Sequence, residues 1–494
     1  MQVDGGFEAI REAWRSDAGP RMQMLIDGQW CDAEGDTRFA CFDPYAEQSW
    51  GSVPQASASD VDLAVRAAHA AFNGPWRAVL PAARFALLRR LGDLISQNAE
   101  LLACTQVREN GKCYSEMRPG VNSLAADCSY FGAMGETLHG YTVQPSIPGF
   151  HAYTRREPIG VIAAITPWNT PLGLLGWKLF PALAAGNTVV IKPSEVTPIS
   201  TLILGQLIEQ AGFPPGVVNI VTGAGETGKA LVAHPLVDKI AFTGSSATGT
   251  AIGKAAAERH ARVSLELGGK SPNIIFDDAD LDAAVRGIVS GIFAATGQSC
   301  NACSRVLVQR GVFDTVVAWL KERADAIRFG DPLDPATEMG PLASQPQLAK
   351  VTGYFDIAAG EGLNPVTGAG RPERSGLFVK PTIYADPPLG SRLVREEIFG
   401  PVVVVIPFDT EDHAVQIAND TQYGLASGVW TRNLALAHRM IERIRAGVVW
   451  VNTYRMGGHA VPFGGMKASG IGREMGIDAL DQYTEVKSVW INLA

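Results

Sequence analysis

The sequence predicts an α/β protein that contains two doubly wound parallel sheets, and three observations support this prediction. Short runs of β-branched residues alternate with helical stretches from about residue 157 onward, which is the pattern of parallel strands joined by crossover helices. The same alternation begins again after Gly268 and Gly269. The chain has 494 residues, enough for two or three domains. Two successive α/β units imply two domains with a ligand-binding cleft between them.

The first unit consists of five predicted strands and the helices that connect them. The strands are expected over residues 160–165, 188–191, 217–221, 239–242 and 263–267, and the helices over residues 172–185, 198–211, 226–234 and 247–260. Residues 61–72 and 82–98, which precede this unit, are also predicted to be helical. Because ligands bind at the carboxyl ends of parallel strands, the residues that follow each strand are the first candidates for function.

The second unit repeats this arrangement toward the C-terminus. Its strands are expected over residues 273–276, 305–308, 401–406, 428–430 and 447–451, and its helices over residues 281–295 and 312–327. A last apolar strand is predicted over residues 486–492, at the very end of the chain. Because an unpaired apolar strand would be an open sheet edge, we expect it to pair with another segment or with a second subunit.

Composition and charge indicate a globular protein of the cytoplasm. Apolar residues make up 46% and charged residues 19% of the chain, as in ordinary globular proteins rather than disordered or fibrous ones. The formal net charge is −8 without basic clusters, which argues against nucleic acid or anionic membrane as a partner. The seven cysteines are an odd number, which suits a reducing compartment, and the charged first twenty residues do not form a signal peptide.

A glycine-rich turn follows the third predicted strand at residues 223–229. With Gly225 and Gly228 it fits a dinucleotide fingerprint and most of a phosphate-binding P-loop. However, Ala230 stands where a P-loop needs Ser or Thr, and Thr248 stands where the dinucleotide pattern expects an acidic residue. The turn alone therefore favours a plain strand-to-helix connection over a nucleotide site.

Two further segments lie where predicted strands end. The turn at residues 242–249 either binds a phosphate through the amides at the start of its helix or begins a helix that is capped by Ser245 or Ser246. Lys192 and Glu195 follow the second strand of the first unit. They either form a surface ion pair or hold ribose hydroxyls in a binding cleft.

Cys300, Glu266 and Asn169 are the residues best suited to catalysis. Cys300 and Cys303 form a CxxC pattern, which is typical of a redox pair or half a metal site, although a lone thiol is by default buried and inert; without a second such pair, a zinc site is not expected. Glu266 ends an apolar strand, where desolvation raises the pKa of a carboxyl and suits it to be a general base unless it pairs with Lys270. Asn169 alone would be a turn former. Together at strand ends, these residues indicate an active site.

Seven motifs, spread over the part of the chain that follows residue 20, occur in the order found in one protein family. They are Pro167-Trp168-Asn169, Lys192-Pro-Ser-Glu195, Phe242-Thr-Gly244-Ser245, Glu266-Leu-Gly-Gly-Lys270, Gly297-Gln-Ser-Cys300, Glu396-Glu397-Ile-Phe399-Gly-Pro401 and Pro462-Phe463-Gly-Gly465. On these motifs the sequence resembles the NAD(P)-dependent aldehyde dehydrogenase superfamily. The resemblance implies an aldehyde dehydrogenase-like α/β fold, with two doubly wound parallel-sheet domains and an oligomerisation hairpin and strand.

The resemblance also implies domain boundaries and an assembly. A cofactor-binding domain is expected over residues 1–139 and 159–268, and a catalytic domain over residues 269–468. The oligomerisation elements are expected over residues 140–158 and 483–494. Since such elements build dimers or tetramers in the family, we expect a homodimer or homotetramer.

The catalytic roles are implied by the same resemblance. Cys300 would be the nucleophile, Glu266 the general base and Asn169 the donor of an oxyanion hole, while Lys178 and Glu474 match positions linked to proton relay. The family's substrate tunnel is lined at positions that correspond to Thr170, Trp177, Gly457 and Phe463.

The resemblance further implies NAD as the cofactor. Lys192 and Glu195 would hold the adenosine ribose, and Glu397 with Phe399 the nicotinamide ribose. The other expected contacts, with Gly244 and Ser245 at the pyrophosphate, are Ile165, Thr166, Pro167, Trp168, Ser194, Gly225, Gly228, Phe242, Thr243, Leu267 and Gly268. Glu195 would repel the 2′-phosphate of NADP by up to ~4 kcal/mol at an effective dielectric of about 20, so NAD is favoured over NADP.

The expected reaction is oxidation of an aldehyde to the free acid. Hydride cannot leave a planar carbonyl without forming an acylium ion, so attack by a thiolate first gives a tetrahedral thiohemiacetal. Hydride transfer then leaves a thioester, which water activated by Glu266 hydrolyses; that carboxylate favours hydrolysis over transfer to coenzyme A. Arg455 and His459 either bind a carboxylate-bearing semialdehyde or belong to a solvated loop.

Two other function classes are less consistent with the sequence. A thiol hydrolase or acyltransferase without a nicotinamide would need a histidine base, and none of the eight histidines lies in the seven motifs. A structural NAD-binding oligomer would not need Cys300, Glu266 and Asn169 together.

Overall fold

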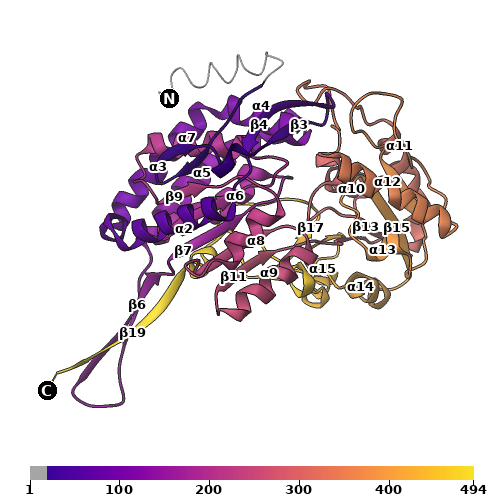
Figure 1. The fold of residues 1–494 in the computed structure, drawn as a ribbon. Helices are drawn as coiled ribbons and strands as arrows, with labels where there is room; N and C mark the ends of the chain where they lie inside the picture. The colour runs from indigo at the N-terminus through magenta and orange to yellow at the C-terminus, as the bar shows by residue number, and fades with distance from the viewer. Residues whose placement is uncertain (1–18, 494) are drawn as a thin grey trace.

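The structure is a computed structural model, and it describes residues 19–493. The prediction about the charged N-terminal segment, and the outermost ends of the predicted domains at residues 1–18 and 494, lie outside the described residues. The described chain forms two lobes, each built on its own sheet, and a projecting ribbon of strands (Figure 1).

The first sheet has eight strands in the order β18-β11-β10-β7-β8-β9-β1-β2. Its five parallel members confirm the five predicted strands: β7 (Val161–Ile165), β8 (Thr188–Lys192), β9 (Val218–Ile220), β10 (Lys239–Thr243) and β11 (Arg262–Glu266). The sheet is not wholly parallel, however. Antiparallel strands complete both sides, namely β1 (Met24–Ile26) and β2 (Gln29–Cys31) on one and β18 (Gly470–Ile471) on the other.

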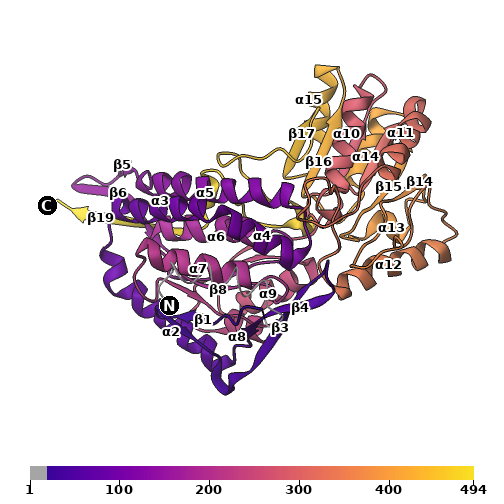
Figure 2. The same ribbon diagram turned by 90° about the horizontal axis from the view of Figure 1, so that it is seen from above.

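Helices cover both faces of this sheet. One face carries α3 (Pro81–Gln97), α4 (Ala99–Asn110), α5 (Tyr114–Glu136), α6 (Pro171–Ala185) and α7 (Ile199–Ala211), which share one apolar core. The other face carries α2 (Ala58–Asn73), α8 (Gly225–Ala233) and α9 (Ser246–Glu258), which share a second core. Figure 2 shows the sheet between these two layers.

The second sheet has six parallel strands and forms the other lobe. In spatial order they are β14 (Thr382–Ala385), β15 (Val402–Phe408), β13 (Arg305–Gln309), β12 (Pro272–Ile275), β16 (Ala426–Trp430) and β17 (Val448–Val451). One face packs on α10 (Leu281–Ile292) and α11 (Phe313–Asp325), and the other on α12 (Gln345–Gly360), α14 (Glu411–Asn419) and α15 (Leu434–Arg443). Five of the strands were predicted; β14 was not.

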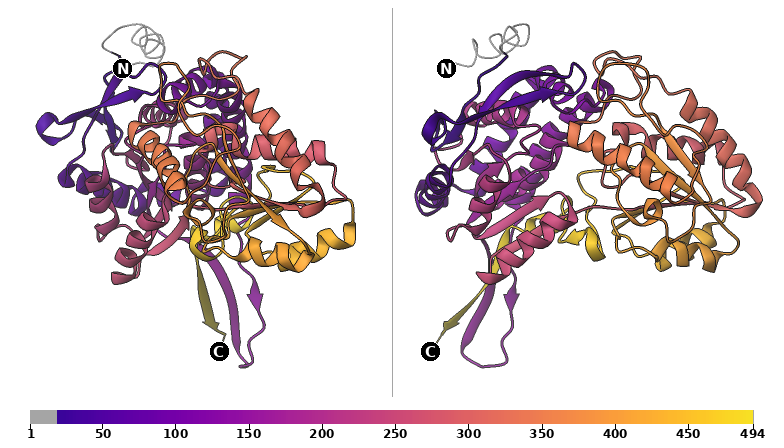
Figure 3. Two further views of the ribbon diagram at one scale, coloured as in Figure 1. Left: turned by 90° about the vertical axis from the view of Figure 1, so that its right-hand side faces the viewer. Right: turned by 45° about the vertical axis from the view of Figure 1, so that its right-hand side comes forward.

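A ribbon of three strands projects from the first lobe (Figures 1 and 3). Its order is β19 (Thr484–Asn492), β6 (Phe150–Pro158) and β5 (Thr142–Val143). The predicted last strand therefore pairs with another segment of the same chain, in antiparallel register from Thr484 opposite Pro158 to Asn492 opposite Phe150. Its other side carries no strand among the described residues.

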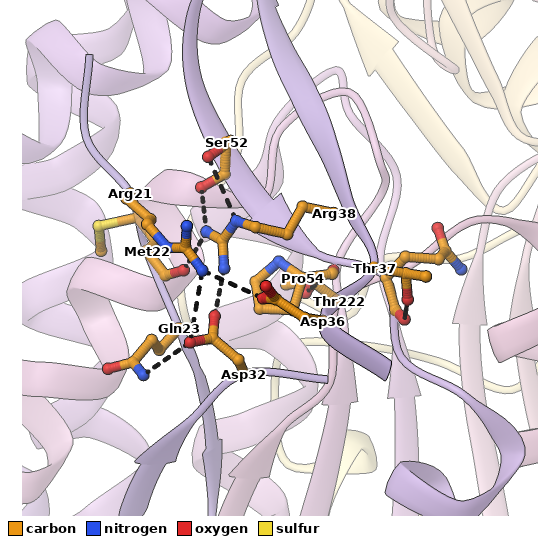
Figure 4. Close-up of polar contacts among 11 residues, drawn as sticks. Arg21, Met22, Gln23, Asp32, Asp36, Thr37, Arg38, Ser52, Pro54 and Thr222 are labelled. Atoms are coloured by element: carbon orange, nitrogen blue, oxygen red, sulfur yellow. Dashed lines mark hydrogen bonds and ion pairs between the residues drawn. The ribbon is translucent and has the colours of Figure 1, made fainter. Parts of the chain in front are cut away.

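A polar network anchors the N-terminal strands to one another (Figure 4). Arg38 lies in the hairpin of β3 (Arg38–Asp43) and β4 (Gln48–Pro54). Its guanidinium donates to the carbonyl oxygens of Met22 (2.6 Å) and Ser52 (2.9 Å) and forms an ion pair with Asp32. Arg38 thus joins this hairpin to the segments around β1 and β2.

The remaining elements are short. They are α13 (Arg392–Arg395), α16 (Asp478–Asp481) and the 3₁₀ turns η1 (Glu34–Asp36), η2 (Pro75–Ala78), η3 (Ala294–Gly297), η4 (Arg310–Val312) and η5 (Lys467–Ser469). Across residues 19–493, we find no helix with the length and apolarity needed to cross a bilayer.

Candidate active site

A pocket of about 170 Å³ lies between the carboxyl ends of parallel strands in the first sheet and the segments that precede β13 and β15 in the second sheet. Its lining includes eleven of the site residues that the sequence predicts. They are Pro167, Trp168 and Asn169 after β7, Thr243, Gly244 and Ser245 around the end of β10, Leu267 and Gly268 after β11, and Cys300, Glu397 and Phe399 from the second lobe. The structure thus brings together residues that stand far apart in the sequence.

A sharp turn at η3, residues 294–297, places Cys300 in the lining of the pocket. The predicted helix over residues 281–295 ends at Ile292, because Ala295 and Thr296 adopt left-handed conformations with φ of +55° and +54°. Glu116 accepts a hydrogen bond from the Ala295 amide (2.7 Å), and Thr296 Oγ1 donates to the Gly340 carbonyl (3.0 Å). These bonds hold a conformation that non-glycine residues rarely adopt.

Cys300 and Asn169 both face this pocket, and Asn169 is buried. Burial, helped by the nearby Glu397 and Glu266 carboxylates, raises the pKa of the Cys300 thiol to about 12. The amide of Asn169 donates to the Gln298 carbonyl at 3.1 Å. The second cysteine of the CxxC pattern, Cys303, is fully buried, and its thiol donates to the Ile288 carbonyl at 3.5 Å.

No disulfide or metal cluster is present in the described part of the chain. All seven cysteines are free thiols. Over residues 19–493, no three His, Cys, Asp or Glu residues are grouped so that they could hold a metal ion.

Glu266 lies behind the pocket in a cluster of buried charges. Its side chain is buried, neither carboxylate oxygen has a hydrogen-bond partner, and it does not line the pocket itself. Burial raises its pKa well above the usual value; Glu474 adds to this, while Lys178 and Arg473 oppose it. Lys178 Nζ lies 2.5 Å from both Glu474 Oε1 and Thr243 Oγ1. The predicted relay residues are therefore assembled next to Glu266.

The alternative pairing of Glu266 with Lys270 is wrong. Lys270 is buried near the carboxylates of Glu397 and Glu396, and burial lowers the pKa of its ammonium to about 7. Glu397 is held differently, since its Oε1 accepts a hydrogen bond from the Gly269 amide at 2.8 Å. Phe399 packs edge-on against Trp168, with ring centroids 5.4 Å apart.

A second group of predicted cofactor residues lies outside this pocket, at the ends of the neighbouring strands. Lys192 ends β8, and its Nζ donates to the carbonyls of Pro193 (2.8 Å) and Gly223 (2.7 Å). A Cβ on Gly228 would contact the Lys192 side chain at 3.5 Å, so the turn at residues 223–229 lies directly beside it. Glu195 is exposed and forms no ion pair with Lys192 among the described residues, so they are not a surface pair.

The other residues of this group lie on the same edge of the sheet. Ile165 ends β7, and the amide of the next residue, Thr166, donates to the Lys192 carbonyl at 3.2 Å. The buried Oγ1 of Thr166 has no partner. Ser194 Oγ lies 3.5 Å from Glu195 Oε2, and Gly225 begins α8. Phe242 lies in β10, where the missing Cβ of Gly244 leaves room for its ring.

Ser245 is the N-cap of α9. Its Oγ accepts a hydrogen bond from the Thr248 amide at 3.2 Å, which confirms one of the two predicted capping residues. Because Ser245 also lines the pocket, the start of this helix of 13 residues points at the pocket.

The predicted substrate residues lie outside the pocket's lining. The rings of Trp177 and Phe463 pack together at 5.3 Å between centroids. Thr170 Oγ1 accepts a hydrogen bond from Lys112 Nζ at 3.1 Å. Arg455 donates to the Ser290 carbonyl at 3.1 Å, and no atom would crowd a Cβ on Gly457. His459, the other candidate carboxylate binder, is already paired with the buried carboxylate of Asp127.

Several residues of this region were not predicted. Lys112 is buried next to Thr170, and burial lowers its pKa to about 8. Leu174, Gln347 and Lys350 line the pocket. The last two lie at the start of α12, a helix whose sequence signals were present in Ser344 as N-cap and in apolar residues spaced three or four apart.

Comparisons with known proteins identify the family. The profile of the "Aldehyde dehydrogenase family" matches residues 30–489. An aldehyde dehydrogenase of Emericella nidulans is 44% identical over 472 residues, which cover 95% of each chain.

Two solved structures resemble the chain closely. The NAD+ complex of an aldehyde dehydrogenase from Bacillus cereus superposes with a TM-score of 0.95, at 43% identity over 98% of this chain and 99% of that one. The NAD+ complex of a Staphylococcus aureus betaine aldehyde dehydrogenase mutant gives a TM-score of 0.94, at 37% identity over 96% and 97%. The chain belongs to the aldehyde dehydrogenase family.

Proposed function

We propose that this protein uses NAD to oxidise an aldehyde to the free carboxylic acid through a thiohemiacetal and a thioester on Cys300. The observation that carries the proposal is the pocket in which the Cys300 thiol and the Asn169 amide meet, with the carboxyl of Glu266 buried behind them. The membership of the chain in the aldehyde dehydrogenase family supports the same reaction class.

The residues at the sheet edge fit a dinucleotide. An unpartnered hydroxyl at Thr166, the buried ammonium of Lys192 and the exposed carboxylate of Glu195 offer polar groups for a ribose. Gly244 and Ser245, at the positive end of α9, would hold a pyrophosphate. Glu397 and Phe399 would hold the second ribose. When bound, the nicotinamide supplies the hydride acceptor, and Glu195 disfavours the extra phosphate of NADP.

The Cys300 thiol must lose its proton before or during attack. With a pKa of about 12, roughly one thiol in 10⁵ is ionised at pH 7. A base must therefore take the proton, and Glu266, whose pKa is raised by burial, is a stronger base than an ordinary carboxylate. Neither of its oxygens is hydrogen-bonded, so no hydrogen bond would have to break for its side chain to turn toward the pocket.

Asn169 and the charge cluster complete the proposed roles. The Asn169 amide, which donates to the Gln298 carbonyl, would turn its donor to the oxyanion that forms when the thiol adds to the aldehyde. Lys178 and Glu474 would pass the proton of the hydrolytic water away from Glu266, since they are hydrogen-bonded to each other beside it. The free state of all seven cysteines fits a reducing cytoplasm.

The exposed ribbon supports a homo-oligomer. β19 leaves one strand edge open and exposes Val486, Trp490 and Ile491, and the next residue, Leu493, is exposed as well. A second subunit would cover this apolar edge, which would otherwise invite unspecific pairing.

The test is NADH formation from a panel of aldehydes that includes semialdehydes, betaine aldehyde and aromatic aldehydes. Wild type should form NADH with at least one of them, and so should Cys31→Ala, a matched control at a partly buried thiol in β2. Cys300→Ala should bind NAD and form no NADH. Turnover by Cys300→Ala at the wild-type rate, or ester hydrolysis without aldehyde oxidation by wild type, would contradict the proposal.

A further inference from the structure

A second and larger cavity lies far from the candidate active site. It has a volume of about 330 Å³ and sits where the projecting ribbon of β6 and β19 joins the first lobe (Figure 1). Its walls come from η2, the start of α3, the end of β6 and the end of α6 at Gly186. No residue is shared between the linings of the two pockets.

Four arginines line this cavity, which we call the arginine pocket: Arg77, Arg84, Arg155 and Arg156. Arg77 lies in η2, and its side chain forms no hydrogen bond or ion pair among residues 19–493, although its charge helps to lower the pKa of Glu157. Arg84 lies in α3, and its Nε and Nη1 donate to the carbonyls of Ala184 (3.0 Å) and Val79 (2.7 Å). These two bonds fix the guanidinium of Arg84 at the wall without neutralising its charge.

The two arginines of β6 have acidic partners, but these carboxylates do not balance the positive charge around the pocket. Arg155 pairs with Glu157 at 3.2 Å, and Arg156 pairs with Asp481 at 2.7 Å. Glu157 is shared with Lys487 of β19. Five cations therefore face two carboxylates, and three positive charges remain uncompensated.

This excess is unusual for the chain as a whole, whose formal net charge is −8. Burial lowers the pKa of Arg84, and no carboxylate opposes this effect. Arg84 is partly buried, whereas Arg77 and Arg155 are exposed. A partly desolvated guanidinium without a carboxylate partner is costly unless an anion joins it. Arginine forks match carboxylate and phosphate oxygens with paired hydrogen bonds.

We propose that the arginine pocket binds a compact polyanion with two or three phosphate groups, either a free polyphosphate or the phosphate end of a nucleotide. A charge of about three on the ligand balances the excess of three on the protein. The volume of about 330 Å³ lies at the small end of ligand sites, about 300–1,000 Å³, so it admits the phosphates and leaves a nucleoside outside. This inference does not depend on the proposed reaction.

The experiment is calorimetric titration of the NAD-saturated protein with inorganic pyrophosphate, tripolyphosphate and ADP. Saturation with NAD keeps the probes out of the dinucleotide site. Arg77→Gln is the test variant, because Arg77 has no structural partner to lose. Arg155→Gln is a second variant in β6. Arg89→Gln is the matched control, since Arg89 is exposed on the same helix as Arg84 but outside the pocket.

Wild type should bind pyrophosphate at one site per chain. Arg77→Gln and Arg155→Gln should each raise the dissociation constant about tenfold or more, and Arg89→Gln less than about twofold. The same concentration of pyrophosphate should also raise the melting temperature of wild type more than that of Arg77→Gln. Tighter binding of ADP than of pyrophosphate would identify a nucleotide as the ligand, and equal binding a free polyphosphate. Absence of binding by all three probes, or equal effects of Arg77→Gln and Arg89→Gln, would overturn the proposal.

Discussion

Cys300 and Glu266 are both acids whose surroundings favour the neutral form. Burial raises the pKa of each, and each carboxylate near them raises it further. The proposed reaction must therefore overcome a cost of ionisation at its first step, and stabilisation of the oxyanion has to supply much of the rate. Asn169 is the side chain placed to give it.

Asn169→Ala should lower kcat about 10²- to 10³-fold, because one oxyanion donor is lost. The affinity for NAD should stay within a small factor, as measured by fluorescence titration. Asn169→Asp, which has similar size but no amide donor, should show a comparable loss. A melting curve like that of wild type would exclude misfolding as the cause, and a kcat within tenfold of wild type for Asn169→Ala would disprove the role.

Glu266→Gln should separate the two halves of the reaction. If Glu266 activates the hydrolytic water, this variant should release about one equivalent of NADH in a burst and then stop at the thioester, and the burst should be slower than in wild type because the base for the Cys300 thiol is also lost. Stopped-flow absorbance measures the burst. Glu258→Gln, an exposed glutamate of α9, is the control and should turn over normally. Undiminished steady-state turnover by Glu266→Gln would rule out this role.

Elements are joined by side chains that reach across the fold, and Glu109 is an example. It lies in α4 and is fully buried, and its Oε1 accepts hydrogen bonds from the amides of Ile199 (2.5 Å) and Ser200 (3.2 Å) at the start of α7. Pro198, the N-cap of α7, has no side-chain cap. The Glu109 carboxyl of α4 therefore caps the N-terminus of α7.

The contribution of Glu109 to the stability of wild type should fall as the pH rises from about 5 to about 8. Burial raises the pKa of Glu109 from 4.5 to about 8, so the folded state holds its proton over a range in which the unfolded state has lost it. Glu109→Gln keeps an acceptor for the two amides but cannot ionise. Between pH 5 and pH 8, the unfolding free energy of Glu109→Gln should therefore rise relative to that of wild type by a few kcal/mol, which is the order of magnitude that the pKa shift implies.

Urea unfolding of both proteins at the two pH values measures this difference. Glu136→Gln, at an exposed position at the end of α5, is the control and should follow wild type. Parallel pH profiles for wild type and Glu109→Gln would contradict the prediction. Glu109→Ala should destabilise at both pH values, because the two buried amides lose their acceptor.

The sequence predicted the elements whose signal is local. The parallel strands are continuous apolar runs because both faces are buried, and β7, β8 and β10 were placed to within one residue. By contrast, α5 was missed because Pro119 and Gly120 suggest a turn. The helix forms, with Pro119 inside it, because it packs on α3 and α6.

The candidate site was predicted only in part for a related reason. Cys300, Glu266 and Asn169 were found because they belong to motifs, and Glu266 and Asn169 also lie at the ends of predicted strands. The contacts of Lys112 with Thr170, and of Asp127 with His459, join residues 58 and 332 positions apart. Nothing in the sequence at Ala295 and Thr296 indicates their left-handed conformation, and two of the bonds that hold it run to Glu116 and Gly340, which lie elsewhere in the chain. No local pattern encodes such partners.

For the whole molecule, the proposed oligomer depends on the open edge of β19. Val486→Lys should shift the molar mass measured by light scattering toward the monomer, because a lysine on a strand edge opposes pairing with another chain. Leu434→Lys is the control, since Leu434 is 73% exposed in α15, away from the ribbon. A wild-type mass for Val486→Lys, or dissociation by both variants, would contradict this assembly.

The path of the chain has a consequence for its synthesis on the ribosome. β11 ends at Glu266, but β18, the strand that pairs with it, begins at Gly470. In the same way Glu474, the partner of Lys178, is synthesised 296 residues after that lysine. At typical translation speeds, roughly 200 further residues take on the order of 10 to 40 s. During that time the nascent first lobe carries an unpaired strand and a buried lysine without its partner. Chaperones that shield exposed strands would act on this chain mainly in that interval, and catalytic competence would come only as translation ends.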